Sequence, residues 1–553
     1  MRHAEGPLLT VDLSDRTVDE TGCSDVLGAF IGGRGVGTKL AYDRLPFDAD
    51  PLGEENRLFL TTGPLQTSRT SFTGRMSATA LSPLTGGLLS SNAGGFLSRN
   101  FAATGYAAVE LVGASDEPAA IHVRDDRVEF EPVPGLEGAL VSEVTEYVRE
   151  THGLDAEHVA CVGPAGENLV RFASIMTSEH RTFGRGGLGA VLGSKNVKAI
   201  TFDGDLEPSV ELPDAATEIH REAATADHVM KRQGTAGLTA FANEVGALPT
   251  RYFSELSFEG AGEIDGDAVE TRKVGKGTCS QCAFACKLPT RDERTGLETE
   301  GPEYETVMAF GSNAGVGDIR AVMKSNDLCD EFGLDTISCG DVVSAYLASE
   351  DRFGDADLVH ETVERIAYRE GIGDRLAEGI DRVHEELGVE NWTAKGMEFA
   401  AHDGRALNGQ ALAFATANRG ADHLYGSMYT HEYPLVSPDA AFDPEGFEGK
   451  PERLVRKENH NALLDSAIVC RFSRDVVSED RLAALLDADY EALLAVGERV
   501  VDLERRFNNE RGFDRVDDSL PYDLPGFEAA LSEYYSMRGW GDDGTVPPGR
   551  VDG

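Results

Sequence analysis

The sequence predicts an α+β protein, with a β-rich N-terminal domain followed by two mainly helical domains. Short alternating runs, each ended by Gly, Pro, Asp or Asn, recur from residue 1 to about residue 207 and are typical of strands. From about residue 208 the apolar residues recur at helical spacing instead. With 553 residues, 41% of them hydrophobic, the chain is long and apolar enough for several domains with full cores.

The first predicted domain, residues 1–207, is built from short strands and glycine-rich connections. Strands are expected at 8–13, 57–60, 107–112, 120–123, 128–130 and 198–202. Glycine is dense at 32–35, 86–87, 94–95 and 184–189. Such stretches let backbone amides approach an anion closely, but none fits the strand–turn–helix frame of a dinucleotide site. They are therefore predicted to be turns.

The second and third predicted domains, residues 208–392 and 393–553, are helical. In the second domain, helices are expected at 215–232, 319–332, 342–348 and 360–387, the last with a break at Gly371. In the third, they are expected at 452–469, 480–486 and 491–507.

The net charge of −45 is spread through ordinary amphipathic sequence, and the apolar content argues against disorder. Arginine greatly outnumbers lysine among the cations. This acidic, lysine-poor composition indicates a salt-rich cytoplasm, because molar salt shortens the Debye length to about 3 Å and screens self-repulsion. The charge excludes nucleic acid as a partner. No membrane span or cleavable leader is expected, so the prediction is a soluble cytoplasmic protein.

Four cysteines suggest a metal centre. Cys279, Cys282 and Cys286 form a C-x2-C-x3-C loop, and Cys470 follows far downstream. Four thiolates can hold a [4Fe–4S] cluster, which would indicate one-electron redox chemistry. They also suit tetrahedral Zn²⁺, although structural zinc sites usually show a second C-x2-C pair, which is missing here. Disulfides are not expected in a chain this long with eight cysteines.

Several motifs occur in one order along nearly the whole chain. They are 70–75, 81–86 (LSPLTG), 92–95 (NAGG), 162–169 (VGPAGENL), 184–196, the cysteine loop, 301–305 (GPEYE), 330–335 (DEFGLD) and 534–540. With these motifs the chain resembles the aldehyde ferredoxin oxidoreductase family, whose members carry a tungsten bis-pterin cofactor and one [4Fe–4S] cluster. The resemblance favours the cluster over zinc. It also implies that the β-rich domain forms the base of the cofactor site and that the helical domains cover it.

The resemblance implies which residues hold the cofactors. Tungsten, with molybdenum as the second choice, would be bound by four pterin sulfurs and no side chain. Asn92 and the backbone at Arg185 and Gly186 match positions that hold a Mg²⁺ bridging the pterin phosphates. Arg75 matches an arginine between cluster and pterin, where its donors suit both. The residues that match the two pterin-contacting motifs are Asp330, Gly333, Leu334, Asp335 and Asp465.

Glu305 and His423 are the catalytic residues that the resemblance implies. Oxidising an aldehyde to an acid requires attack of water or hydroxide on the carbonyl and removal of two electrons, with loss of two protons when water attacks and one when hydroxide does. A carboxylate can take the proton, and an imidazole can donate to the carbonyl oxygen. The cluster would then pass electrons singly to a ferredoxin. His180 is expected to be structural only.

Two positions depart from the family pattern. Residues 324–327 read KSND where relatives often carry Glu-x-x-His, which binds an iron between subunits. A homodimer is therefore possible, but without that interface iron. Ile468 stands where the second pterin motif normally has glycine. Because a branched residue accepts positive φ poorly, a shifted pterin or a changed cluster environment is expected.

Two rival functions follow from the same residues. One is a family relative that acts on another substrate or in the acid-reducing direction. The other is a non-catalytic iron–sulfur electron carrier that has lost the pterin. The presence of Asn92, Asp330, Glu305 and His423 argues against the carrier. A ferredoxin from the same cytoplasm would also be acidic, so its docking is expected to hold or improve as salt rises.

Overall fold

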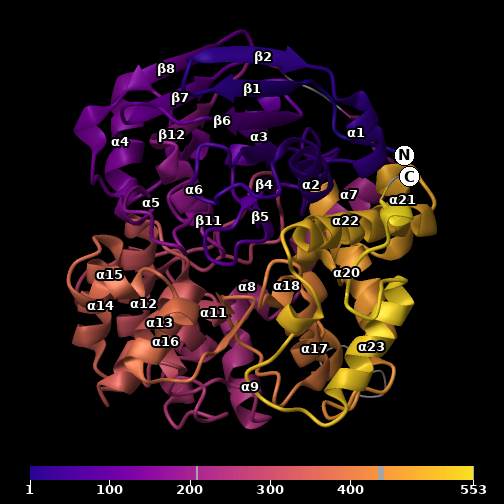
Figure 1. Cartoon of the computed structure of the whole chain (residues 1–553). Helices are drawn as coiled ribbons and strands as arrows, with labels where there is room; N and C mark the ends of the chain where they lie inside the picture. Colours follow the sequence, from indigo (N-terminus) through magenta and orange to yellow (C-terminus); the bar gives the residue numbers. More distant parts are fainter. Residues whose placement is uncertain (207–209, 434–440, 552–553) are drawn as a thin grey trace.

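A computed structural model describes residues 1–206, 210–433 and 441–551 of the chain. In Figure 1 the strand-rich N-terminal region forms the upper half, and two helical groups lie below it, one magenta to orange and one orange to yellow. The predicted α+β architecture is confirmed. The predicted boundary at 207/208 lies outside the described residues. The boundary at 392/393 stays a prediction.

The first six-stranded sheet has the spatial order β2-β1-β6-β3-β4-β5. β6 pairs parallel with β1, and the other neighbours are antiparallel. Edge strand β2 is exposed along its length, whereas β4 is fully buried, so the β4 side of the sheet faces the rest of the protein. The strands are β1 (Leu8–Asp12), β2 (Thr17–Thr21), β3 (Leu58–Thr61), β4 (Met76–Leu81), β5 (Leu88–Ala93) and β6 (Ala108–Val112).

The second sheet has the order β11-β10-β9-β12-β7-β8, with only the β12–β7 pair parallel among the described strands. Apolar side chains of both sheets meet in one core, where the rings of Phe101 and Phe202 lie edge to face at 4.7 Å. The six predicted strands are confirmed to within a residue or two. The strands are β7 (Ala119–Val123), β8 (Val128–Pro132), β9 (Val159–Cys161), β10 (Ile175–Thr177), β11 (Arg181–Phe183) and β12 (Val197–Phe202).

The glycine stretch at 32–35, predicted to be a turn, is instead the start of a helix, α2. A Cβ on Gly32 would lie 2.7 Å from the Thr62 carbonyl oxygen, and one on Gly33 would lie 2.2 Å from that of Asp465. The glycines therefore let α2 pack directly between the first sheet and α20. The N-terminal helices are α1 (Ser24–Phe30), α2 (Gly33–Arg44), α3 (Leu97–Ala103), α4 (Val141–His152), α5 (Pro164–Glu167) and α6 (Leu188–Ser194).

The first helical group surrounds a large apolar core that reaches the edge of the N-terminal region. The helix predicted at 215–232 is wrong as one element, because the backbone leaves helical geometry at Ala226 and Lys231 Nζ binds the carbonyl oxygens at the end of α7. The elements are α7 (Asp214–Thr225), α8 (Met230–Gln233), α9 (Thr239–Glu244), α10 (Gly266–Glu270), the hairpin β13 (Thr290–Arg291) and β14 (Glu298–Thr299), α11 (Tyr304–Val307) with a π-helical turn (Met308–Ser312), α12 (Ile319–Phe332), α13 (Thr336–Ser349), α14 (Ala356–Ala367), α15 (Ile372–Leu376), α16 (Ile380–Leu387), and the hairpin β15 (Thr393–Ala394) and β16 (Met397–Glu398).

The last helices share a core with α1 and α2 of the N-terminal region. In this way α20 and α22 connect the two halves of the molecule. The helices are α17 (Asn408–Thr416), α18 (His423–Gly426), α19 (Tyr429–Glu432), α20 (Lys450–Ala467), α21 (Glu479–Leu486), α22 (Tyr490–Glu510) and α23 (Phe527–Arg538). Within the described ranges, none of the helices combines the length and the apolar character that crossing a membrane requires.

Candidate active and cofactor site

The three-cysteine loop and Cys470 are brought together by one segment of the N-terminal region. Ser71 Oγ accepts a hydrogen bond of 2.9 Å from the backbone N–H of Ala283, inside the cysteine loop. The next residue, Phe72, accepts one of 2.7 Å from the backbone N–H of Cys470. All eight cysteines, each in the described part of the chain, are free thiols. The fold thus joins loops almost two hundred residues apart at the predicted cluster site.

The predicted cluster cysteines are half-buried. Burial raises the pKa of Cys282 to about 11 and that of Cys286 to about 12. Thiolates are the form that binds iron, so the positive charge of a metal is required to ionise these side chains near neutral pH.

Arg75 lies between the cysteines and strand β5. Burial alone would lower its pKa, but the neighbouring sulfurs of Cys470 and Cys279 raise it. Its Nη2 donates to the backbone oxygen of Asn92 at 2.6 Å. A Cβ on Gly94 would lie 3.0 Å from the Cys279 sulfur, so glycine is needed where β5 passes the cluster site. Arg75 thus lies beside the predicted cluster cysteines, and its contact with a pterin stays a prediction.

Asn92 and Asp465 form a polar group at the junction of β5 and α20. Asn92 Nδ2 donates to Asp465 Oδ1 at 3.0 Å. Asp465 Oδ2 also accepts from Arg34 at 3.3 Å and from Arg471 at 2.5 Å. Asn92 Oδ1 is buried and has no hydrogen-bond partner among the described residues. An unpaired buried amide oxygen is costly, and it is a ligand that Mg²⁺ accepts.

The glycine-rich loop at Arg185 lies beside the Asn92 strand. Ser91 Oγ donates to the Gly184 carbonyl oxygen at 2.8 Å. Arg185, Gly186 and Gly187 all have positive φ, between 65° and 92°, and a Cβ on Gly187 would lie 2.1 Å from a backbone oxygen. The backbone conformation of the loop therefore requires its glycines. The loop follows β11 of the second sheet and lies beside the strand that carries Asn92, the predicted Mg²⁺ ligand.

The side chain of Arg185 fastens this loop to the helical region. It donates to the backbone oxygens of Glu398 and of Ala421, the latter at 3.1 Å. Its Nε lies 3.5 Å from Asp335 Oδ2. Arg185 is 5% exposed, so it connects three segments inside the protein.

The first pterin motif spans the end of α12 and the start of α13. Asp330 accepts from Asn326 at 2.8 Å and lies 3.7 Å from His180 Nδ1. Gly333 ends α12 with φ 72°, and Leu334 follows as the next residue. Asp335 caps α13 by accepting from two backbone N–H groups. The two carboxylates therefore face the β10–β11 hairpin and the Arg185 loop respectively, and His180 belongs to the group rather than standing apart.

Glu305 and His423 come from different helical groups and meet at a short distance. Glu305 is in the first turn of α11, and its Oε2 accepts from the backbone N–H of Ala401 at 2.8 Å. Its Oε1 lies 3.3 Å from His423 Nε2. The same oxygen lies 3.7 Å from the Nε2 of His402. One carboxylate oxygen thus faces two imidazoles.

His402 was missed by the sequence analysis. Burial, with the neighbouring His423, lowers the pKa of His402 well below its usual value, so this ring is neutral. It stacks on Tyr429 with ring centroids 3.7 Å apart, and its Nδ1 lies 3.3 Å from the hydroxyl of Tyr433. His402 is a single histidine at φ 79° in an irregular segment, and no local pattern marks it. Only the fold places it beside Glu305.

A buried network fixes the position of His423. Asp422 caps α18 and also accepts from Arg419. Although burial raises the pKa of Asp422, Arg419 and His423 hold it well below its usual value. The guanidinium groups of Arg419 and Arg34 lie over the Tyr425 ring, at 4.6 and 3.5 Å from its centroid. Because Arg34 also binds Asp465, this network links the Glu305–His423 pair to the predicted pterin residues.

Comparison with known proteins accounts for nearly the whole chain. Residues 8–204 match the family model "Aldehyde ferredoxin oxidoreductase, N-terminal domain", and residues 212–552 match "domains 2 & 3" of the same family. The tungsten-containing aldehyde ferredoxin oxidoreductase of Thermococcus kodakarensis is 34% identical over 98% of this chain and 97% of its own.

Two further proteins are similar to this chain at lower sequence identity. The WOR-like subunit of an aliphatic sulfonate oxidoreductase from Pyrococcus furiosus is 28% identical over 84% of this chain and 79% of its own. The solved active-site complex BamBC of benzoyl coenzyme A reductase has a TM-score of 0.84 at 21% identity, covering 100% of this chain and 97% of that one. This last similarity shows the fold alone.

Proposed function

Because the chain belongs to the aldehyde ferredoxin oxidoreductase family, we propose that it oxidises an aldehyde to a carboxylic acid and passes the electrons to a ferredoxin. The chain is an oxidoreductase of a tungsten–pterin family; the substrate, the direction of the reaction and the electron carrier belong to the proposal. The observation that carries it is the close approach of Glu305 Oε1 to His423 Nε2, at 3.3 Å, where the two helical groups meet.

The residues present fit the cofactors that the family implies. Cys279, Cys282, Cys286 and Cys470 would hold a [4Fe–4S] cluster. The unpaired Asn92 Oδ1 and the Arg185 loop suit a Mg²⁺ between pterin phosphates, and the pterin contacts would come from Asp330, Asp335 and Asp465. When bound, the tungsten bis-pterin, with molybdenum as the second choice, supplies a two-electron acceptor, and the cluster supplies one-electron transfer to ferredoxin.

Proton movement would be handled by this chain's own side chains. Glu305 Oε2 is held by the Ala401 N–H, which leaves Oε1 to take a proton from the attacking water. His423 Nε2, 3.3 Å from that oxygen, can donate a hydrogen bond to the substrate carbonyl. Tyr433 can donate to Nδ1 of neutral His402, which leaves the Nε2–H of His402 directed at Glu305. His402 thus orients the base.

The test uses protein purified anaerobically from cells supplied with tungstate. About one tungsten and four irons per chain, with aldehyde-dependent ferredoxin reduction, are expected. Glu305→Gln removes the base but keeps the shape, so kcat/KM should fall by about 10²–10⁴-fold with metal content unchanged. Glu255→Gln, which changes a surface carboxylate paired with Arg251, should behave as wild type.

The other outcomes separate the rival functions. Four irons without tungsten or molybdenum, and no turnover of aldehydes, would support the electron carrier. A loaded enzyme that turns over acids or sulfonates instead would support a family relative with another substrate. A Glu305→Gln variant with full aldehyde activity would show that Glu305 is not the base.

We place the reaction in the cytoplasm, with a rate of ferredoxin reduction that stays constant or rises as the salt concentration increases.

A further inference from the structure

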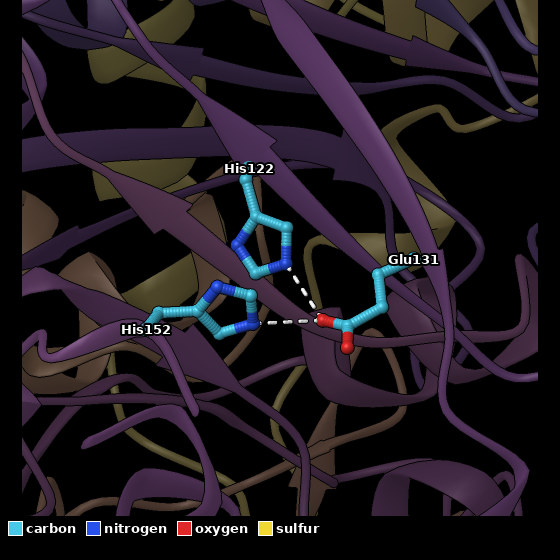
Figure 2. A group of neighbouring side chains, drawn as sticks. All are labelled: His122, Glu131 and His152. Carbon is cyan, nitrogen blue, oxygen red and sulfur yellow. Dashed lines mark hydrogen bonds and ion pairs between the residues drawn. The ribbon is translucent and has the colours of Figure 1, made fainter. Parts of the chain in front are cut away.

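Three side chains outside the candidate active site converge at the edge of the second sheet (Figure 2). His122 Nε2 lies 3.0 Å and His152 Nε2 lies 2.9 Å from the same oxygen of Glu131, Oε2. The ligand atoms of these three side chains all lie within 4.8 Å of one another. In Figure 1 the elements that carry them, β7, β8 and α4, lie at the outer edge of the N-terminal region, far from α11 and α18.

Strand register explains why these side chains meet. β7 and β8 pair antiparallel with His122 opposite Glu129 and Ala120 opposite Glu131. His122 and Glu131 are therefore diagonal neighbours on one face of the sheet. His152 is the last residue of α4, which Gly153 ends in a left-handed conformation. The helix terminus thus directs an imidazole toward the strand pair.

Outer contacts hold two of the three groups in place. His122 Nδ1 lies 2.8 Å from Thr201 Oγ1, on the neighbouring strand β12. The second oxygen of Glu131 accepts from the Tyr147 hydroxyl at 2.6 Å. Histidines and carboxylates that bind metals are usually fixed by such second contacts, which set the tautomer and the ring orientation.

We propose that His122, Glu131 and His152 bind one divalent transition-metal ion, for which Zn²⁺ fits best. Two imidazole nitrogens and a carboxylate oxygen are ligands that Zn²⁺ prefers, at about 2.0–2.2 Å. Tetrahedral angles at those lengths separate ligand atoms by about 3.3 Å, so the two Nε2–Oε2 distances, 3.0 and 2.9 Å, have to open by only a few tenths of an ångström. To bind the metal through Nε2, each neutral imidazole carries its one proton on Nδ1, and at His122 that Nδ1–H can donate to Thr201 Oγ1.

The site is open to solvent on one side. His122 is 1% exposed, whereas the side chains of His152 and Glu131 are 18% and 27% exposed. A metal ion can therefore enter past these two residues, and water can fill the fourth position. The bound ion would fasten α4 to the β7–β8 strand pair. Because the site is remote from the Glu305–His423 pair, binding and stability are its readouts rather than turnover.

The test is equilibrium dialysis of the whole protein, loaded with its cluster, against Zn²⁺ under anaerobic conditions. Wild type should bind one Zn²⁺ per chain more than His152→Gln, which changes the partly exposed ligand. Thr201→Val, which removes only the outer contact, should keep the stoichiometry and weaken Kd by about 10–100-fold. Zn²⁺ should raise the Tm of wild type but not that of His152→Gln.

A matched control variant shows whether loss of the extra Zn²⁺ is specific to the proposed ligands. Among the described residues, His384 forms hydrogen bonds only with the backbone oxygens of Ile380 and Asp381 in its own helix, so His384→Gln should retain the extra Zn²⁺. Equal Zn²⁺ stoichiometry in wild type and His152→Gln, or no extra Zn²⁺ in wild type, would overturn the proposal and leave a hydrogen-bonded triad. Glu131→Gln offers a second ligand variant, and retained iron content and circular dichroism verify the fold of each protein.

Discussion

The C-terminal ends of α12 and α20 can be compared residue by residue. α12 ends on Gly333 at φ 72° and ψ 52°, and α20 ends on Ile468 at φ 60° and ψ 38°. At both ends the next backbone N–H donates at 2.8 Å to the carbonyl five residues earlier. The two predicted pterin motifs therefore share one backbone geometry although one has glycine and the other isoleucine.

The acidic residues of the two motifs differ more than the backbones do. Asp465 accepts from two arginines, Arg34 and Arg471. Asp330 has the weaker partner His180 at 3.7 Å, and burial raises the pKa of its carboxyl group. The α20 end is thus held by two arginine–carboxylate pairs, and the α12 end by a longer contact with one imidazole.

Isoleucine at the α20 end is accommodated by glycines elsewhere. A left-handed conformation costs a residue with a Cβ about 1–2 kcal/mol. Ile468 is fully buried, and Cβ atoms on Gly33 and Gly63 would each lie 2.5 Å from its side chain. Ile468 adopts positive φ despite its branched side chain, because its packing on two glycines offsets the strain. The predicted shift of the pterin or change in the cluster environment stays a prediction.

Replacing the two aspartates should give the largest difference between the ends. Asp465→Asn leaves Arg471 without its carboxylate, whereas Arg34 keeps Glu504, so a loss of about 3 kcal/mol in the free energy of unfolding is expected. Asp330→Asn keeps a side-chain oxygen as acceptor for Asn326 and weakens only the 3.7 Å approach to His180, so about 1 kcal/mol is expected. Denaturant unfolding of both variants measures the difference, and equal losses would contradict the comparison.

The sequence predicted what depends on local periodicity and on motifs. The helix expected at 319–332 has the same bounds in the structure, and the strand at 8–13 differs by one residue. β4 was missed although it alternates, because alanine, which is uncommon in strands, fills two of its apolar positions; β5 was missed because polar residues such as Ser90 interrupt its apolar run. Periodicity finds a strand most readily where large apolar side chains alternate with polar ones.

The candidate site was predicted as a set of residues but not as an arrangement. Motifs gave Glu305 and His423 because each lies in a recognisable stretch of sequence. His402 and Arg34 have no such stretch, and their roles come from contacts across the chain: Arg34 binds Glu504, 470 residues away. Long-range contacts of this kind depend on tertiary packing, which a single sequence does not display.

Exchanging the two helix-end residues should have the second-largest effect. Gly333→Ile would place a Cβ 2.9 Å from the Gly163 nitrogen at positive φ, so a loss of about 2–4 kcal/mol is expected. Ile468→Gly relieves strain but empties a packed space, so a smaller net loss of about 1–3 kcal/mol is expected. Unfolding midpoints of both variants test this order. A more stable Ile468→Gly protein would show that the strain outweighs the packing.

The smallest effect concerns pH at the α12 end. The nearby Asp330 carboxylate raises the pKa of His180, and Glu300 and Glu179 add to the shift. Because the pKa of His180 is higher in the folded state, protonated His180 stabilises the fold. This contribution is complete below the unfolded pKa of about 6.5, and it is lost as pH rises through the folded pKa. The side chain of His180 is 39% exposed, so solvent limits the effect to about 0.5 kcal/mol. Wild type should therefore be more stable than His180→Gln at pH 5.5 and equally stable at pH 8.5. Molar salt should shrink the difference in the free energy of unfolding. A difference that grows with pH would mean that Asp330 does not stabilise the protonated form of His180.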